Sequence, residues 1–197
     1  MAAGRAGRLG PGALTVALKA TIYKVHLSVA DMDRHHYSEH ALTLARHPSE
    51  NDERMMVRVL AFALFSDEAL EFGKGLCADD EADLWQRDLT GAVERWIDVG
   101  QPDEKWMRKA SARADEVVVL SYGRAADVWW QGVAGKVARF DNLRVLTIAP
   151  EVGPELATLT QRTMRLQATI QDGQVWLTDG ERSVLVEPRT LQAARLQ

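Results

Sequence analysis

Several features are scarce in this 197-residue chain, and each absence narrows the functions open to it. The single cysteine, Cys77, excludes an internal disulfide, and no run of about 20 apolar residues could span a bilayer. Lys and Arg number 24 against 28 Asp and Glu, and the net charge of −4 argues against a protein that coats nucleic acid through general electrostatics. P-loop, dinucleotide-binding and Ser/His/Asp or Cys/His catalytic signatures are also missing. We therefore expect a soluble, cytoplasmic protein with no membrane partner.

The chain is long enough to bury one substantial core, since 46% of its residues are hydrophobic. Nothing in the composition indicates two domains. Residues 1–16, MAAGRAGRLGPGALTV, lack hydrophobic periodicity and are expected to form a flexible N-terminal extension. We expect residues 17–190 to form a single domain.

Hydrophobic periodicity predicts a mixed α/β fold. The expected strands are 18–29, 37–44, 83–88, 93–99, 116–120, 143–148, 165–170, 175–178 and 183–186. The expected helices begin after the N-caps Ser49 and Asp103 and span about 125–140 and 154–161. Two Asp-Gly steps predict hairpin turns near the carboxyl end. We expect that C-terminal meander to pair with the N-terminal hairpin as a second, antiparallel layer beside a mixed sheet.

The most informative stretch is 81–110, which predicts a β-hairpin feeding a helix. Two runs rich in aromatic and branched residues flank a short turn at 89–92. If Asp88 faces Val93 across that turn, the register brings further pairs together on one face of the sheet. These pairs are Arg87 with Glu94, Trp85 with Trp96, and Asp83 with Asp98.

The facing aspartates are the pair that needs an explanation. Two carboxylates about 5 Å apart repel by roughly 3 kcal/mol at an effective dielectric of about 20. A divalent cation, a shared proton, a different register or strand ends that fray into water would each relieve this repulsion. We favour a cation, Mg²⁺ or Mn²⁺, because such ions prefer carboxylate oxygens as ligands.

The following helix places lysines behind the two aspartates. Lys105 and Lys109 are four residues apart, so they lie on one face of that helix. Acids on neighbouring strands with a lysine behind them are typical of metal-dependent phosphodiester hydrolysis. In that chemistry the metal polarises the phosphate and lowers the pKa of a bound water, and the lysine stabilises developing negative charge.

Five strings in the sequence resemble the YaeQ family of bacterial proteins. They are ALKATIYK at 17–24, TLARHPSENDERMM at 43–56, GLCADDEADLW at 75–85, WIDVGQPDE at 96–104 and RTMRLQATIQDGQVWL at 162–177. The resemblance runs from about residue 17 to about residue 187. It implies a fold similar to that of the PD-(D/E)XK nucleases, the restriction-endonuclease-like class, with a modified active-site motif.

The resemblance also implies roles for individual residues. Asp83 resembles the first acidic residue of the nuclease motif and Asp98 its (D/E) residue. Gly100 stands two residues after Asp98, where the nuclease lysine belongs. A glycine has no side chain that could bind a metal or neutralise negative charge. Lys109, with Lys105 as the alternative, would then supply the positive charge from the helix.

Other acids could complete such a metal site. In the nuclease fold the helix before the core strands often contributes one, and Glu53 or Glu50 could do so here. The alternative is that these residues only cap the helix. Glu81 or Asp80 would replace Asp83 as a ligand if the register of the hairpin shifts.

The histidines offer a second set of possible metal ligands. All five precede residue 48, and His36 and His40 share one face of the second strand. No cysteine or acidic cluster accompanies them, so we expect a solvated hairpin at this place and no zinc site.

These sequence features leave three possible functions. The first is a Mg²⁺-dependent hydrolase acting on nucleic-acid phosphodiesters. The second is a nuclease-derived fold that has lost catalysis and serves as a binding or regulatory module for protein or nucleic acid, which Gly100 and the acidic net charge favour. The third, a general nucleic-acid binder without chemistry, fits the charge balance poorly.

Overall fold

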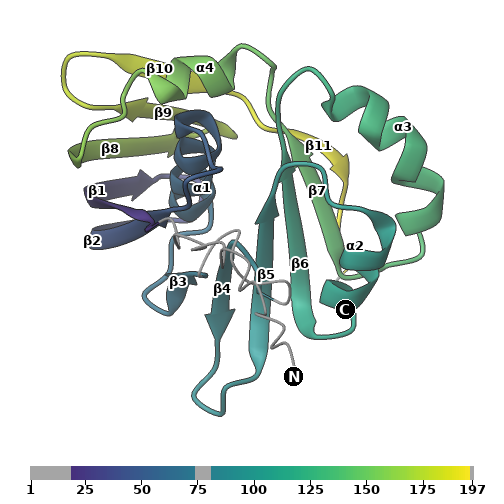
Figure 1. The fold of residues 1–197 in the computed structure, drawn as a ribbon. Coiled ribbons are helices and arrows are strands. Elements are labelled where there is room, and N and C mark those ends of the chain that lie inside the picture. Colours follow the sequence, from purple (N-terminus) through teal and green to yellow (C-terminus); the bar gives the residue numbers. More distant parts are fainter. Residues whose placement is uncertain (1–18, 74–80, 196–197) are drawn as a thin grey trace, which may run out of the picture.

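The computed structural model of the protein describes residues 19–73 and 81–195 (Figure 1). The expected extension at 1–16 and the alternative ligand Asp80 lie outside these residues. In chain order the elements are β1 (Thr21–Asp31), β2 (His36–Arg46), α1 (Asp52–Leu64), β3 (Leu70–Phe72), β4 (Leu84–Arg87), β5 (Val93–Val99), α2 (Glu104–Ser111), β6 (Ala114–Ser121), α3 (Ala126–Val137), β7 (Leu143–Thr147), α4 (Val152–Ala157), β8 (Thr163–Gln171), β9 (Gln174–Thr178), β10 (Ser183–Val186) and β11 (Arg189–Gln192).

These elements build a mixed α+β domain from two sheets, which confirms the predicted fold class. The five-stranded sheet has the order β10-β9-β8-β1-β2, and the six-stranded sheet has the order β11-β7-β6-β5-β4-β3. In the second sheet β6 runs parallel to both of its neighbours, β5 and β7. Its apolar run Val117–Leu120 fits a central strand that is buried on both faces.

The N-terminal hairpin and the C-terminal meander share one sheet, as predicted, but the strands at their junction are parallel. β1 and β2 pair antiparallel across a turn, whereas β8 lies beside β1 with Lys24 next to Thr163. The expectation of a wholly antiparallel layer is therefore wrong at this junction. The chain returns to β1 from the other sheet through α4, so no hairpin turn forces β8 to reverse direction.

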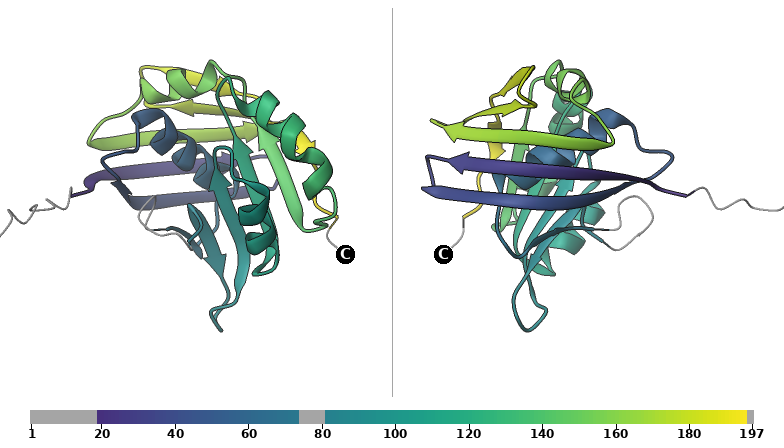
Figure 2. Two further views of the ribbon diagram at one scale, coloured as in Figure 1. Left: turned by 45° about the vertical axis from the view of Figure 1, so that its right-hand side comes forward. Right: turned by 90° about the vertical axis from the view of Figure 1, so that its left-hand side faces the viewer.

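Helix α1 lies between the two sheets (Figures 1 and 2). Every residue from Met55 to Ala63 in this helix is buried, as expected of a helix that is apolar on nearly all sides. These helix residues share one hydrophobic core with Ile97 and Val99, which lie on one face of the six-stranded sheet. Helices α2 and α3 cover the opposite face, where Trp96 is buried.

The β4–β5 hairpin has the predicted register over most of its length. Trp85 pairs with Trp96, and their rings make an edge-to-face contact at 6.1 Å. A β-bulge then places Arg87 opposite Val93, so the predicted pair of Arg87 with Glu94 is wrong. The cause is a tight turn in which the Asp88 carboxylate accepts the backbone N–H groups of residues 90 and 92.

The start of α1 also differs from the prediction. Asn51 is the N-cap, and its side chain accepts the N–H of Arg54 at 2.8 Å. Ser49 instead hydrogen-bonds the His47 ring at 2.6 Å, so its hydroxyl is not used as a cap. The predicted N-cap of α2, Asp103, is confirmed. None of the helices in residues 19–73 and 81–195 is long and apolar enough to cross a membrane.

Candidate functional site

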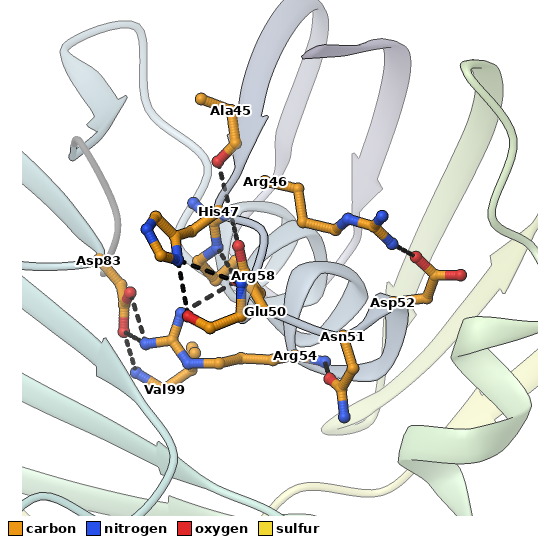
Figure 3. Close-up of polar contacts among 11 residues, drawn as sticks. Ala45, Arg46, His47, Glu50, Asn51, Asp52, Arg54, Arg58, Asp83 and Val99 are labelled. Carbon is orange, nitrogen blue, oxygen red and sulfur yellow. Dashed lines mark hydrogen bonds and ion pairs between the residues drawn. The ribbon is translucent and has the colours of Figure 1, made fainter. Parts of the chain in front are cut away.

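The candidate site lies where the start of β4, the end of β5 and the first turn of α1 meet (Figure 3). Asp83 directly precedes β4, and Asp98 is the sixth residue of β5. Both side chains are buried, with 7% and 6% of the residue surface exposed. Leu84 pairs with Ile97, so Asp83 and Asp98 are each the next residue beyond this pair. The N–H of Asp83 lies 3.3 Å from Asp98 Oδ1.

The Asp83 carboxylate forms an ion pair with Arg54, a residue that the sequence analysis did not predict for the site. Arg54 Nη2, from α1, lies 2.8 Å from each of the two carboxylate oxygens, and the Val99 N–H donates to Oδ2 at 2.9 Å. Burial alone would lower the pKa of Arg54, but the charges of Asp83 and Glu50 outweigh it and raise that pKa. This arginine therefore remains a cation and neutralises Asp83.

The same arginine belongs to a larger buried network. Arg54 Nη1 lies 3.0 Å from Glu50 Oε1, and Arg58 donates to both oxygens of Glu50 at 2.9 and 2.8 Å (Figure 3). Arg58 also donates to the Ala45 carbonyl oxygen at 3.1 Å and has no exposed surface. Two arginines and two carboxylates thus balance their charges between α1 and the hairpin, as buried ions must.

The Asp98 carboxylate has different partners. The indole N–H groups of Trp96 and Trp106 both donate to Oδ2, at 2.8 and 2.6 Å. Burial, followed by the nearby charge of Asp83, raises the pKa of Asp98 to about 7, although the two indole bonds act in the opposite direction. Asp98 is therefore a carboxyl group that exchanges its proton near neutral pH.

The two carboxylates engage helices on opposite faces of the six-stranded sheet. Asp83 binds α1, which packs on the face of Ile97 and Val99. Asp98 binds Trp106 of α2, which packs on the other face. The hairpin register therefore brings the two backbones together as predicted, while the carboxylate groups turn towards different partners.

The two candidate lysines differ in their surroundings. Lys105 is exposed on α2. Lys109 is half-buried, and its Nζ lies 5.0 Å from the ring centroid of Trp106, the same tryptophan that binds Asp98. Both lysines belong to α2, and Lys109 is the one whose ammonium group lies over the ring of an Asp98 partner.

The other predicted acids have different surroundings, although Glu53 lies near enough to Tyr122 to act on its pKa together with Arg54, Glu50 and Asp83. Glu53 packs against α4, because a Cβ added to Gly153 would lie 2.2 Å from Glu53 Oε1. Glu81 is half-buried just before β4. Glu50, the alternative to Glu53, does join the site, but it does so through Arg54 and Arg58.

The backbone explains the residue at the expected lysine position. Gly100 has a φ of +108°, a left-handed value that side-chain-bearing residues rarely adopt. Its N–H donates to the Leu120 carbonyl oxygen at 3.0 Å, which fixes this conformation at the end of β5. A lysine at residue 100 would therefore strain the chain.

These contacts do not fit a Mg²⁺ or Mn²⁺ ion between Asp83 and Asp98. Such an ion needs near-octahedral oxygen ligands, whereas protein N–H groups already donate to both oxygens of each carboxylate. Among the described residues, no group of three or more His, Cys, Asp or Glu side chains is placed to hold a metal ion.

One signal in the sequence could have predicted the arginines. Arg58 interrupts an otherwise apolar stretch from Met55 to Ala63, and a charge inside a buried helix requires a partner. Glu50, Arg54 and Arg58 follow one another at intervals of four, the spacing of residues on one helix face. The pairing of Arg54 with Asp83 depends on tertiary packing and had no such signal.

The fold and site define a mixed α+β protein. A buried network of arginines and carboxylates lies next to two aspartates, Asp83 and Asp98, on neighbouring strands. The chain belongs to the YaeQ family: the family model described as YaeQ protein matches residues 16–188. The resemblance found in the sequence is therefore confirmed over nearly the whole described domain.

Individual relatives agree with this assignment. The protein called "Uncharacterized protein YaeQ" of Escherichia coli (strain K12) is 47% identical over 172 residues, which cover 87% of this chain and 95% of that protein. The crystal structure of the YaeQ protein from Xanthomonas axonopodis pv. citri matches with a TM-score of 0.86 at 50% identity, covering 88% of this chain and 99% of the other. That of the Pseudomonas syringae YaeQ protein matches with a TM-score of 0.85 at 36% identity, covering 89% and 98%.

Proposed function

We propose that this chain is a nuclease-fold protein of the cytoplasm that acts by binding a partner and does not hydrolyse phosphodiesters. The PD-(D/E)XK character of the core is part of this proposal and comes from the resemblance in the sequence. The observation that carries it is the Arg54 guanidinium, which lies 2.8 Å from both oxygens of Asp83. A fixed arginine there supplies the positive charge that a catalytic metal would otherwise bring, and it cannot activate a water.

The outer face of the five-stranded sheet is the surface that we assign to partner binding. The described helices lie behind this sheet when it is viewed from outside (Figure 2, right). The strand registers align one transverse row across it, made of Tyr37, Ala30, Thr169, Trp176 and Leu185. Exposed aromatic and aliphatic side chains on one face are typical of protein interfaces.

The composition of this row favours a protein partner over nucleic acid. Tyr37 is 65% exposed and Leu185 is 42% exposed. Lys24, His26 and Arg165 lie further along the same strands, but the chain as a whole carries a net charge of −4, which opposes binding to a polyanion.

A cleavage assay tests the loss of catalysis. Purified protein is incubated with labelled single-stranded and duplex DNA and RNA in Mg²⁺ or Mn²⁺, beside Asp98→Asn as the matched variant. We expect equal, background cleavage from both. Metal-dependent cleavage that Asp98→Asn abolishes would overturn the proposal.

Site-specific photo-crosslinking in cells tests the binding surface. A photoreactive residue is placed at Tyr37 or Leu185, and at Asp115 as an exposed control in the other sheet. We expect a discrete crosslinked protein from the first two positions and none from the third. Equal crosslinking from all three positions would refute the assignment of this face.

Metal-dependent phosphodiester hydrolysis is the second candidate, and one observation favours it. The pKa of Asp98 is raised to about 7, so this buried carboxyl group lacks a full counter-charge, and Lys109 lies against the Trp106 ring beside it. Under this alternative Asp83, Asp98 and a lysine would act together once Arg54 withdrew. Activity gained by Arg54→Met in Mg²⁺ would favour hydrolysis, whereas continued inactivity would favour the binding module.

A further inference from the structure

The β2 strand forms an edge of the five-stranded sheet, and its outer side has no neighbouring strand in the part of the chain that the structure describes. In the order β10-β9-β8-β1-β2, only β1 lies beside it. The strand has 11 residues, and its register with β1 continues without a bulge from His36 to Arg46. It contains neither proline nor lysine, which natural proteins use to keep other strands away from an exposed edge. The edge is therefore long, regular and open to pairing.

The hydrogen bonds of β1 determine which residues of β2 face the open edge. The Lys24 N–H donates to the Arg162 carbonyl oxygen, beside β8, at 3.0 Å. Even-numbered residues of β1 therefore direct their backbone groups towards β8, and odd-numbered residues direct theirs towards β2, because the direction alternates along a strand. The odd-numbered residues of β1 are paired with even-numbered residues of β2, as Val25 is with Leu42. The odd-numbered residues of β2 thus direct both their N–H and C=O groups to the open edge.

The four residues that present both groups are Tyr37, Glu39, Ala41 and Thr43. The next odd-numbered residue, Ala45, supports this direction, since its carbonyl oxygen accepts from Arg58 Nη2 of α1 at 3.1 Å. Within residues 19–73 and 81–195, no hydrogen bond reaches the backbone groups of the other four residues. Unpaired N–H and C=O groups that repeat at every second residue match the backbone of an added strand.

The inner flank of this edge is apolar. Leu42 of β2 and Phe72 of β3 both pack against the hydrophobic core below the sheet. Phe72 stacks on Phe62 of α1 at 5.4 Å, and the His40 ring meets Phe62 edge-on at 4.9 Å. Leu42 and Phe72 are only half-buried, so part of each is left for an added strand to cover.

His36 and His40 also belong to the inner flank. Both are half-buried, and their Nε2 atoms lie 3.3 and 2.8 Å from Ser66 Oγ. The expectation of a solvated hairpin is therefore wrong for these two residues. Because the imidazoles make their contacts inside the fold, the backbone edge is the feature that a partner can contact.

The outer flank is polar and carries one negative charge. The side chains of the four edge residues are all exposed, and Glu39 is the charged one among them. It faces Ser28 across the β1–β2 pair, so β1 places no cation opposite it. A basic side chain on an added strand would complement this charge.

The shape of the molecule selects a single extended segment as the occupant. The β4–β5 hairpin extends past β2, on the side of the five-stranded sheet where α1 lies (Figures 1 and 2). A second copy that paired antiparallel through the same edge would be related to the first by a two-fold axis perpendicular to this sheet. Its six-stranded sheet would then occupy the same space as that of the first copy. A lone strand about 4.8 Å from β2 needs no such space.

We propose that the open edge of β2 binds an extended peptide segment of a partner protein, which adds a strand to the five-stranded sheet. Backbone hydrogen bonds to residues 37–43 hold the segment. Its side chains alternate, with apolar residues towards Leu42 and Phe72 and polar residues, one of them basic, beside Glu39. This edge differs from the exposed row that includes Trp176 and Leu185, so the inference goes beyond the surface assigned above.

Selection from a library of random nonapeptides displayed on phage tests the site on the full chain. We expect enriched peptides that alternate apolar and polar residues. Ala41→Pro removes one N–H from the open edge and leaves the hydrogen bonds to β1 intact, so it should weaken binding of a selected peptide at least about tenfold. Ala41→Val keeps that N–H, and as the matched control it should bind as wild type does.

Amide hydrogen exchange shows whether the selected peptide occupies this edge. In the free protein the Leu42 N–H should be protected by β1, and the N–H groups of Ala41 and Thr43 should exchange at least about tenfold faster. The peptide should slow exchange at Ala41 and Thr43 at least about tenfold and leave Leu42 unchanged.

Three results would overturn the proposal: no enriched peptide, equal binding to Ala41→Pro and Ala41→Val, or unchanged exchange at Ala41 and Thr43 when the peptide binds. If Ala41→Pro fails to fold, exchange in wild type gives the answer. Crosslinking from Leu185, on the opposite edge strand β10, reports on the outer face alone, so failure here leaves the proposed function standing.

Discussion

The buried carboxyl group of Asp98 makes the stability of this protein depend on pH, and Asp98→Asn should remove that dependence. Its pKa is about 7 in the folded protein and 3.8 in its ordinary environment. Between those values the folded state holds a proton that the unfolded state has released. Stability therefore falls as pH rises from about 4 to about 7, and this contribution is constant outside that window.

The magnitude follows from the size of the shift. A pKa raised from 3.8 to about 7, at about 1.4 kcal/mol per unit, corresponds to roughly 4 kcal/mol of stability lost across the window. Asparagine stays neutral, and its carbonyl oxygen can still accept from Trp96 and Trp106. The asparagine NH₂ group would then face the Asp83 N–H, and two donors cannot bond to each other. The 3.3 Å contact of that N–H with Asp98 Oδ1 is therefore lost, at a cost of about 1 kcal/mol.

Urea unfolding at several pH values between 4 and 7.5 provides the assay. We expect Asp98→Asn to be about 1 kcal/mol less stable than wild type at pH 4 and about 3 kcal/mol more stable at pH 7.5. Asp115→Asn, an exposed carboxylate of β6, is the control and should follow wild type at every pH. A difference between Asp98→Asn and wild type that stays constant over this range would refute the buried, proton-exchanging carboxyl group.

Further substitutions test three other features by the same unfolding measurement. Arg54→Met leaves a buried carboxylate without its partner and should cost about 3–5 kcal/mol; a loss below about 1 kcal/mol would contradict the ion-pair network. Asn51→Ala should cost about 1 kcal/mol and Ser49→Ala less than about 0.5, and the reverse order would restore Ser49 as the N-cap. Gly100→Ala should cost about 1–2 kcal/mol because of its positive φ, whereas Gly132→Ala, in open space on α3, should stabilise by about 0.5–1; equal effects would contradict the strain.

Much of the fold was predictable because local chemistry dominates there. Alternating apolar residues predicted β1 and β2, and the apolar runs predicted the buried strands β6 and β7. Asp103 predicted the start of α2, since an aspartate that can accept N–H groups of the first turn is a local feature. The short strands β3 and β11 were not predicted, because β3 has only three residues and β11, Arg-Thr-Leu-Gln, has a single apolar residue.

The candidate site was predictable only in part. The register of Trp85 with Trp96 correctly placed the backbones of Asp83 and Asp98 side by side. The repulsion expected between the two carboxylates has two resolutions in the structure. An arginine from α1 neutralises Asp83, and burial raises the pKa of Asp98 so that it can hold a proton.

Local patterns were enough to predict which segments pair and which residues the hairpin brings together, because strand alternation and turn chemistry act over a few residues. The partners of those side chains depend on packing between elements that are far apart in the chain. Arg54 reaches Asp83 across 29 positions of the chain, and the two histidines of β2 meet Ser66 from the end of α1. Such contacts depend on how α1 packs between two sheets, and no local pattern encodes that packing.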